Sequence, residues 1–417
     1  MAVAMRAVRP RIRSPYLKTK GYPKPTPEPP FRAFTFTQTR LQTSTHASYY
    51  RGGTSRALIF QPRHLPKDRS QWGSIFLQLM GSPDPYSRQL DGLGAGISSL
   101  SKICVVSPSS SSDASADVDY TFVGIGIENS EVDMAGNCGN MSAAIGPYAF
   151  NERLLGDIEY EQAGEVVVRI RNTNTGVVIR SKFPVSGGQA EVKGGYAIDG
   201  VSGTGARIQL DFLRPGGAKT GRLIPTGLVA QEVAGTRASC VDAANPCVFV
   251  RAEDVGVDGT ILPNDFNKLP EILAKLEEIR ETAAVAMGMA KTRSEVPRTI
   301  PKIAIVSPPS THKVLSGDMV DASSVDLVVR FISDTQPHRA IPLTGALCAA
   351  VAAKIKGSVV EQCLASSRAN AGMITIGHSS GRIQVNATMD STGEAECATV
   401  FRTAKRIFDG KVYWNED

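Results

Sequence analysis

The sequence predicts an α/β (α+β) fold of two similar, pseudo-symmetric lobes, on the basis of an internal repeat, a repeated order of elements and alternating strands. Residues 101–110 read SKICVVSPSS, and residues 301–310 read PKIAIVSPPS. Lys, Ile, Val, Ser, Pro and Ser recur at a spacing of 200. Both segments are apolar runs that end at Ser-Pro, which is typical of buried strands.

Each copy of the repeat is followed by the same elements: a second strand, a Gly-containing turn, an Ala-rich helix and two alternating strands. In the first half we expect the second strand at 117–123, the helix at 141–150 and the two alternating strands at 166–172 and 177–183. In the second half we expect the second strand at 324–330, the helix at 345–354 and the two alternating strands at 382–387 and 399–407. A ten-residue match with the same continuation argues against a chance repeat.

A longer amphipathic helix is expected at 269–283, because apolar side chains recur there at helical spacing and three glutamates occupy the opposite face. Its counterpart in the first half is expected at 71–79. The predicted division is a leader at 1–44, a first lobe at 45–203 and a second lobe at 204–417. A cleft between two lobes is where a small ligand is expected.

Composition favours a soluble globular protein, with 42% hydrophobic and 21% charged residues. No apolar run reaches the ~18 residues that cross a membrane, so no membrane partner is expected. The net charge of +6 comes from the first 40 residues, which hold nine basic residues and one acidic residue. The remainder has 37 basic and 39 acidic residues, so no basic face is expected to bind nucleic acid.

The leader is Arg-rich at its start, as mitochondrial presequences are. Seven prolines between Pro10 and Pro30 prevent a continuous amphipathic helix, which favours a disordered extension. The seven cysteines are scattered without a CxxC pair, as in reduced intracellular proteins. We therefore expect a cytoplasmic protein, with a mitochondrial location as the alternative, and a homodimer stays open.

Cys138 lies in the segment AGNCGNMS, directly before an Ala-rich helix. A helix N-terminus lowers the pKa of a thiol and also binds anions. Cys138 is therefore a candidate nucleophile or proton donor, and the same loop could bind a carboxylate of the ligand. The alternative is a tight turn that holds an inert, buried cysteine.

Lys102 begins an otherwise apolar strand, where partial burial makes a lysine a usable general base. The alternative is a solvated strand start, and the repeat places a second lysine, Lys302, at the equivalent position. Lys102 is preferred because serines surround it and a Gly-rich loop precedes it. That loop lacks the spacing of nucleotide-binding motifs.

Two further loops have the composition of anion sites. YRGGTSR at 50–56 combines glycines, hydroxyls and two arginines, which suits a carboxylate. The alternative is an ordinary polar hairpin loop, which can have the same composition. GHSSG at 377–381 carries His378, and a lone histidine is more often structural. The substrate-binding candidates from the loops and the two repeat copies are Arg51, Gly53, Thr54, Ser55, Arg88, Ser101, Asn137, Gly139, Asn140, Ser310 and His378.

No HExxH, GxSxG or paired-carboxylate motif occurs, which excludes the common metalloprotease, serine-hydrolase and glycosidase patterns. No metal and no cofactor are therefore expected.

Taken together, the motifs resemble those of the 2-methylaconitate cis-trans isomerase (PrpF-type) family, which includes aconitate-delta-isomerases and methylitaconate isomerases. The resemblance covers roughly 45–417. It rests on RGGTS at 51–55, GSPDPY at 81–86, RQLDG at 88–92, SK at 101–102, GNCGN at 136–140, DAANP at 242–246, PK at 301–302 and HR at 338–339. Arg56-Ala57 and Ser379 depart from the family's usual residues.

The resemblance implies a diaminopimelate epimerase-like fold, in which each lobe is a curled mixed β-sheet around a central helix. It also implies that Lys102 and Cys138 are catalytic, and that the second lobe has no cysteine at the position near Leu343 where related epimerases carry one. The expected activity is cofactor-independent isomerisation of an unsaturated di- or tricarboxylic acid, by removal and return of a proton. The rivals are a racemase or epimerase, a decarboxylase on the same scaffold, and a non-catalytic carboxylate-binding protein.

Overall fold

A computed structural model of the chain describes residues 42–110, 115–156, 158–161, 163–365 and 373–415. Most of the predicted leader, 1–41, lies outside these ranges, and the first strand, β1, begins at Thr43. No helix in these ranges is both long and apolar enough to cross a membrane.

The strands of the first half precede those of the second half in the chain, with one exception at the C-terminus. The first half contains β1 (Thr43–Gly52), β2 (Ser55–Phe60), β3 (Lys102–Pro108), β4 (Val118–Ile125), β5 (Val132–Asp133), β6 (Gly164–Asn172), β7 (Val178–Ser186), β8 (Gln189–Ala190) and β9 (Ile208–Leu213). The second half contains β10 (Gln231–Val233), β11 (Thr236–Ala243), β12 (Asn245–Arg251), β13 (Lys302–Ser307), β14 (His312–Lys313), β15 (Met319–Val320), β16 (Leu327–Ser333), β17 (Gln336–Pro337), β18 (Met373–His378), β19 (Gly381–Met389) and β20 (Ala395–Arg402). The last strand, β21 (Ala404–Trp414), pairs with β1.

Both halves repeat one pairing scheme, which confirms the predicted duplication. β2 is parallel to β3, β3 antiparallel to β4, β4 parallel to β6, and β6 antiparallel to β7. In the same way β12 is parallel to β13, β13 antiparallel to β16, β16 parallel to β18, and β18 antiparallel to β19. β9 and β20 pair with each other and join the two sheets. The lobe limits 45–203 and 204–417 stay a prediction.

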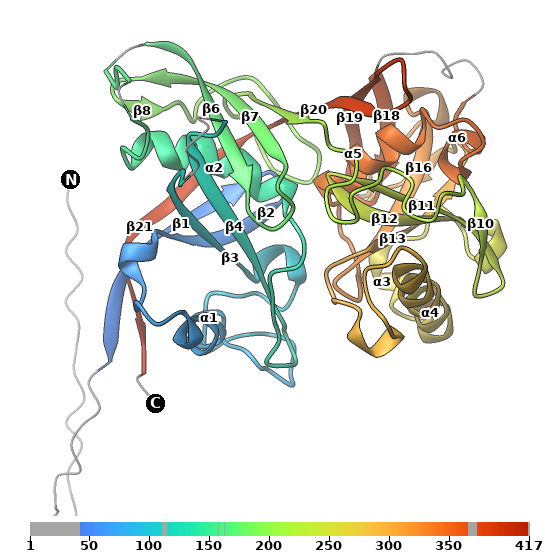
Figure 1. Cartoon of the computed structure of the whole chain (residues 1–417), viewed down its shortest axis with the longest axis horizontal. Helices are drawn as coiled ribbons and strands as arrows, with labels where there is room; N and C mark the ends of the chain where they lie inside the picture. The colour runs from blue at the N-terminus through green and yellow to red at the C-terminus, as the bar shows by residue number, and fades with distance from the viewer. Residues whose placement is uncertain (1–41, 111–114, 157, 162, 366–372, 416–417) are drawn as a thin grey trace, which may run out of the picture. The chain divides into compact units, whose positions relative to one another are not determined.

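One helix lies inside each curled sheet, as Figure 1 shows for α2 (Gly139–Asn151) and α5 (Leu343–Ala352). Every residue of α5 is buried, because Ala and Gly let strands approach it on all sides. A Cβ at Gly345 would lie 2.6 Å from the Phe331 ring, and one at Gly146 would lie 2.7 Å from the Ser181 hydroxyl. These glycines set how closely each sheet wraps its helix.

A second helix covers the outer face of each lobe's parallel strand pair. α1 (Trp72–Met80) packs on Ile103 and Val105 of β3, whereas Cys104 and Val106 face the α2 side. α4 (Pro270–Ala286) packs in the same way on β13. Two short helices, α3 (Pro263–Phe266) and α6 (Val359–Gln362), complete the second half. β3 and β13 are buried on both faces, which explains their continuous apolar runs.

The expected helices and most of the expected strands agree with the observed ones, but β18 was not expected, so the alternating pair of the second half is β18 and β19 rather than 382–387 and 399–407. We expected one strand at 399–407, but β20 ends at Arg402 and β21 begins at Ala404. The intervening Thr403 carbonyl accepts hydrogen bonds from the Gly53 backbone N–H and the Arg51 guanidinium. The chain crosses at this point from the second sheet back to the first, which no local pattern indicates.

Replacing Gly345 with Ala should destabilise the protein by about 1–3 kcal/mol, because the new methyl group would overlap the buried Phe331 ring. Urea unfolding would measure the change. Gly195→Ala is the control, since no atom lies within 4 Å of that Cβ position, and its effect should stay within about 0.5 kcal/mol. Equal stability of Gly345→Ala and the parent protein would contradict this account of the packing.

Candidate active site

Cys138 is the N-cap residue of α2, in an extended conformation directly before the first helical turn. Its side chain is 8% exposed. The first turn of an α-helix leaves backbone N–H groups without intrahelical partners, and the thiol accepts one from Met141. Local sequence thus places a sulfur atom at the positive end of a helix.

Lys102 is the first residue of β3, and its side chain reaches Cys138. The Lys102 Nζ donates to Cys138 Sγ at 3.3 Å and to Ser55 Oγ at 3.3 Å. The Ser55 hydroxyl lies 3.8 Å from the same sulfur. The parallel pairing of β2 and β3 holds Ser55 and Lys102 at neighbouring strand ends. The structure therefore brings both predicted catalytic residues into direct contact.

The surroundings of Cys138 lower its pKa below the usual value of 9.0. Burial by itself raises this pKa, but the positive charge of Lys102, the Met141 N–H and the hydrogen bonds from Lys102 and Ser55 together outweigh burial. At two other buried cysteines burial prevails, and it raises the pKa of Cys240 to about 12 and, despite the charge of Arg251, that of Cys363 to about 11. Cys138 is thus set apart as an acidic thiol.

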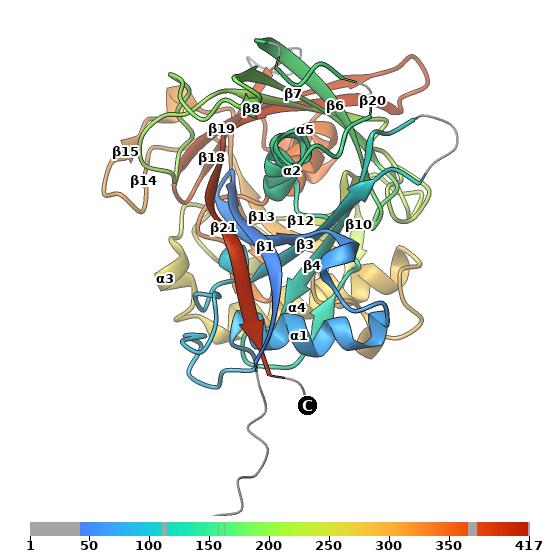
Figure 2. The same ribbon diagram turned by 90° about the vertical axis from the view of Figure 1, so that its left-hand side faces the viewer.

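The first turns of α2 and α5 meet beside this thiol, and Figure 2 shows the two helices one behind the other. A Cβ at Gly139 would lie 2.7 Å from Leu343 and 2.9 Å from Thr344, so only glycine permits the contact. The Asn245 amide bridges the helices, donating to the Asn137 carbonyl at 2.7 Å and to the Thr344 hydroxyl at 3.1 Å. It also accepts the Asn137 N–H at 3.1 Å.

A narrow cavity of about 30 Å³ opens at this junction. It is lined by Ser98, Lys102, Phe122, Asn137, Cys138, Gly139, Asn140, Thr299, Lys302, Ser333, Asp334, His338, Pro342, Leu343 and Thr344. Lys302, the repeat's second lysine, is 7% exposed and donates to the Thr299 carbonyl at 2.8 Å. Burial lowers its pKa. Both lysines of the repeat therefore line the same cavity, and Lys302 is not a surface residue.

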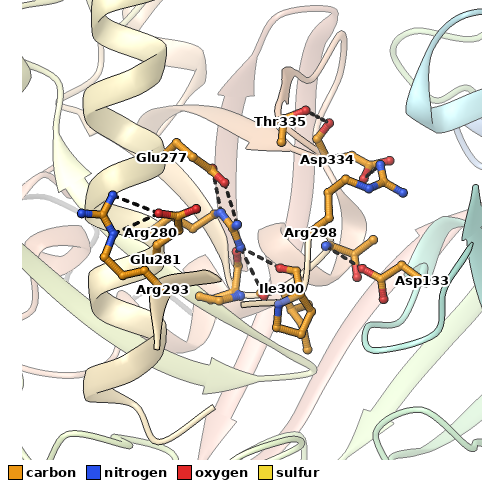
Figure 3. A network of polar contacts seen from close by, with 12 residues as sticks. Asp133, Glu277, Arg280, Glu281, Arg293, Arg298, Ile300, Asp334 and Thr335 are labelled. Atoms are coloured by element: carbon orange, nitrogen blue, oxygen red, sulfur yellow. Dashed lines mark hydrogen bonds and ion pairs between the residues drawn. The ribbon is translucent and has the colours of Figure 1, made fainter. Parts of the chain in front are cut away.

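A polar network fixes the segment that leads into β13 (Figure 3). Arg280 of α4 pairs with Glu277 at 2.7 Å and donates to the Ile300 carbonyl at 3.3 Å. Asp133 of the first half accepts the Thr299 N–H at 2.9 Å, and Arg298 pairs with Asp334. Thr299, Asp334 and Lys302 take their positions in the cavity from this network.

Several polar groups of the cavity lack partners. Both amide atoms of the Asn137 side chain and the Thr299 hydroxyl are buried without a hydrogen bond among the described residues. Such groups are costly unless a ligand or water satisfies them. His338 is neutral, because burial lowers its pKa to about 3. Across the described ranges, no group of three or more His, Cys, Asp or Glu side chains is arranged to hold a metal ion.

Other predicted binding residues surround a second, adjoining cavity. The Asn140 amide donates to the Thr54 hydroxyl at 3.2 Å, and Thr54 lines this second cavity with His378 and Arg402. Gly53 permits the approach, since a Cβ there would lie 2.2 Å from the Asn140 side-chain oxygen.

Six predicted binding residues do not line either cavity. Two of them, Gly53 and Ser55, lie directly against Asn140 and Cys138, and the other four lie elsewhere. Arg51 is held by the carbonyls of Gly53 and Thr403, and Ser101 is buried and donates to Gln89 at 2.6 Å. Arg88 is exposed in a different hollow beside the C-terminal strand. The Ser310 carbonyl hydrogen-bonds the ring of His312. Arg51 and Ser101 shape the loops around the site, and we do not include any of these four in it.

Sequence reasoning missed Arg402, Thr299 and Thr344, and assigned no binding role to Asn245. Asn245 lies in the DAANP motif at 242–246, and Lys302 lies in the repeat, so patterns marked both positions. Arg402 lies in an alternating strand where no motif marks it.

Comparison with known proteins agrees with this geometry. The chain is 38% identical over 371 residues to 3-methylitaconate isomerase of Eubacterium barkeri, covering 87% of this chain and 95% of the relative. It is 36% identical over 388 residues to 2-methyl-aconitate isomerase of Shewanella oneidensis (strain ATCC 700550 / JCM 31522 / CIP 106686 / LMG 19005 / NCIMB 14063 / MR-1), covering 89% and 97%. These relatives confirm the predicted enzyme class, an isomerase.

Solved structures confirm the predicted fold. A crystal structure of methylitaconate-delta-isomerase matches with a TM-score of 0.71 and 37% identity, covering 90% of this chain and 96% of that chain. A hydroxyproline epimerase from Agrobacterium vitis shares the fold alone, with a TM-score of 0.50 and 11% identity, covering 91% and 94%. The family described as PrpF protein matches residues 42–415. The chain therefore belongs to the PrpF protein family.

Proposed function

We propose that this isomerase moves or rotates a carbon–carbon double bond of an unsaturated polycarboxylic acid, using Lys102 and Cys138 as the proton-transferring pair. The observation that carries the proposal is the 3.3 Å contact between Lys102 Nζ and Cys138 Sγ, inside a cavity whose Asn137 amide has no partner among the described residues. The relatives' names, 3-methylitaconate and 2-methyl-aconitate isomerase, support this substrate class.

The cavity is suited to carboxylates. Lys302 contributes a buried positive charge, and the first turns of α2 and α5 contribute backbone N–H groups and the positive ends of two helix dipoles. The Asn137 amide and the Thr299 hydroxyl supply the remaining hydrogen bonds. A bound acid would satisfy groups that are otherwise left without partners.

In the proposed reaction, the Lys102 amine removes a proton from the carbon next to the conjugated double bond. The electron pair spreads over the double bond and the carboxylate as a dienolate, whose oxygen is stabilised by the helix N–H groups. The Cys138 thiol then donates a proton to another carbon of the dienolate, and its sulfur becomes a thiolate.

The pair is reset internally. The protonated Lys102 passes its extra proton to the Cys138 thiolate across 3.3 Å, which restores amine and thiol without any outside reactant. The pKa of Cys138 is lowered by the charge of protonated Lys102, so that charge stabilises the thiolate which forms once Cys138 has donated its proton. If the dienolate rotates before it is reprotonated, the product is a cis-trans isomer, and otherwise the double bond has shifted.

A racemase that uses two facing thiols is not favoured by the geometry. Pro342 occupies the N-cap of α5, the position that Cys138 occupies on α2. Cys348 lies six residues further along α5, fully buried, and donates to the Val241 carbonyl. The second half thus offers no thiol at the cavity among the described residues.

Lys102→Ala and Cys138→Ala should each lower turnover of cis-aconitate-type acids by about 10²- to 10⁴-fold, because each removes one proton-transferring group. Nuclear magnetic resonance of the acids in heavy water would follow both isomerisation and deuterium uptake. Lys405→Ala and Cys397→Ser are matched controls, since Lys405 is exposed and Cys397 half-buried, and neither lines the cavity.

Full turnover by both cavity variants would refute the assignment. Loss of carbon dioxide from the acids would show a decarboxylase instead. Binding without deuterium uptake would show a protein that holds carboxylates and does no chemistry on them.

The Cys138 thiol should ionise at a pH below 9.0, and Lys102→Met should move its pKa upward, because burial then acts without the neighbouring positive charge. The thiolate's ultraviolet absorbance, taken as the difference from Cys138→Ser, would measure this pKa. Lys405→Met changes the net charge equally and should leave the pKa unchanged. An unchanged pKa in Lys102→Met would mean that the two groups do not interact in solution.

A further inference from the structure

Arg402 is a buried cation without a carboxylate partner among the described residues. It is 6% exposed and lies at the end of β20. Its Nε donates to the Asn140 side-chain oxygen at 3.3 Å, and its Nη1 donates to the Phe401 carbonyl at 2.9 Å. Its Nη2 has no partner in the described part of the chain, although the residue lines the second cavity. One arm of the guanidinium is therefore left for a ligand.

Two other buried arginines show that this arrangement is unusual within the protein. Arg330 uses all three guanidinium nitrogens on the carbonyls of Thr260, Ile261 and Val329. Arg280 uses all of its nitrogens on Glu277 and on carbonyls around Ile300. In both arginines, every guanidinium nitrogen therefore has a hydrogen-bond acceptor within the protein. Burial lowers the pKa of Arg402 to about 10 and does the same to Arg330, so the unused Nη2 group, and not the pKa, sets Arg402 apart.

The other charged groups around this cavity leave Arg402 available. The Asp199 carboxylate lines the same cavity and its negative charge acts on Arg402, but it accepts the Arg382 backbone N–H at 2.5 Å and forms no direct ion pair with the guanidinium. His378 is neutral, because burial and the charge of Arg402 keep its pKa well below the usual range, and its Nδ1 accepts the Ser380 N–H. The Thr54 hydroxyl adds a further polar group to the wall.

Asn140 forms the wall between the two cavities. It lines the Lys102–Cys138 cavity, while its side chain contacts Arg402 and Thr54 of the second cavity. Asn140 is two residues from Cys138 in the first turn of α2. Arg402 and Thr54 therefore contact the same helical turn that carries Cys138, from the side of the second cavity.

We propose that Arg402, with Asn140 and Thr54, binds a carboxylate remote from the reacting carbons, so that the enzyme selects tricarboxylic over dicarboxylic acids. This inference rests on the proposed function for the site of chemistry. A tricarboxylate pairs with the unpaired guanidinium, whereas a dicarboxylate held at Lys302 and the helix N-termini leaves it empty. A bidentate or charge-assisted pair with arginine in a buried site gives both affinity and orientation.

The test compares Arg402→Gln and Arg402→Lys with the parent protein on cis-aconitate and on a methylitaconate-type dicarboxylate. Arg402→Gln should raise KM for the tricarboxylate roughly 30- to 1,000-fold, as loss of one partner of a buried charge pair does, and leave the dicarboxylate's KM and kcat unchanged. Arg402→Lys should recover part of the lost affinity. Arg207→Gln is the matched control, because it removes an exposed arginine that stacks on the neighbouring Phe401.

Calorimetric binding of saturated propane-1,2,3-tricarboxylate, with glutarate as the dicarboxylate, separates this inference from the proposed function. Neither acid can isomerise, so tight binding of the tricarboxylate that Arg402→Gln abolishes supports the subsite even if no isomerisation is found. Equal weakening of both acids, or no change in either, overturns it. Circular dichroism and urea unfolding of both Arg402 variants identify any change that comes from lost folding, and Arg402→Lys, which keeps the charge, then decides the outcome.

Discussion

The meeting of two helix N-termini at the junction of the lobes is the constraint on which the candidate site depends. Gly139 allows the first turn of α2 to touch Leu343 and Thr344 of α5, and Asn245 ties the two turns together. Because both turns carry N–H groups that their own helices cannot use, their junction is intrinsically attractive to anions. Cys138 and Lys102 acquire their chemical environment from this junction.

Unpaired positive charge distinguishes the site from the rest of the interior. Arg280 and Arg330 are buried with a full set of partners, as structural arginines are. Among the described residues, Lys302 donates to one group, the Thr299 carbonyl, and Arg402 keeps a free guanidinium arm. The protein therefore holds cations in a partly dry environment, where an entering polycarboxylate would satisfy them.

The duplicated architecture is used asymmetrically. Equivalent strands, β3 and β13, both begin with a lysine, and equivalent helices, α2 and α5, both point their N-termini at the cavity. Only α2 has a cysteine at its N-cap, while α5 has Pro342. One half thus contributes the thiol, and Lys102 of the same half lies against it. This pairing is suited to moving one proton along a conjugated skeleton.

Local sequence determined the elements of this protein and the two reactive residues. The repeat at 101–110 and 301–310, the alternating strands and the Gly-Asn loop before α2 are patterns whose periods and turn residues act over a few positions, so they can be read without tertiary contacts. The four longer helices and the strands around the repeat were therefore predicted, and Lys102 and Cys138 were singled out as catalytic candidates, whereas their direct contact was not predicted. The tertiary structure alone decided the crossing at Thr403 and the burial of Lys302. It also placed Arg51 and Arg88 away from both cavities, and Arg402 in contact with Asn140. These depend on groups distant in the chain, Asn140 and Arg402 being 262 residues apart, and no local pattern encodes which buried charge is left unpaired.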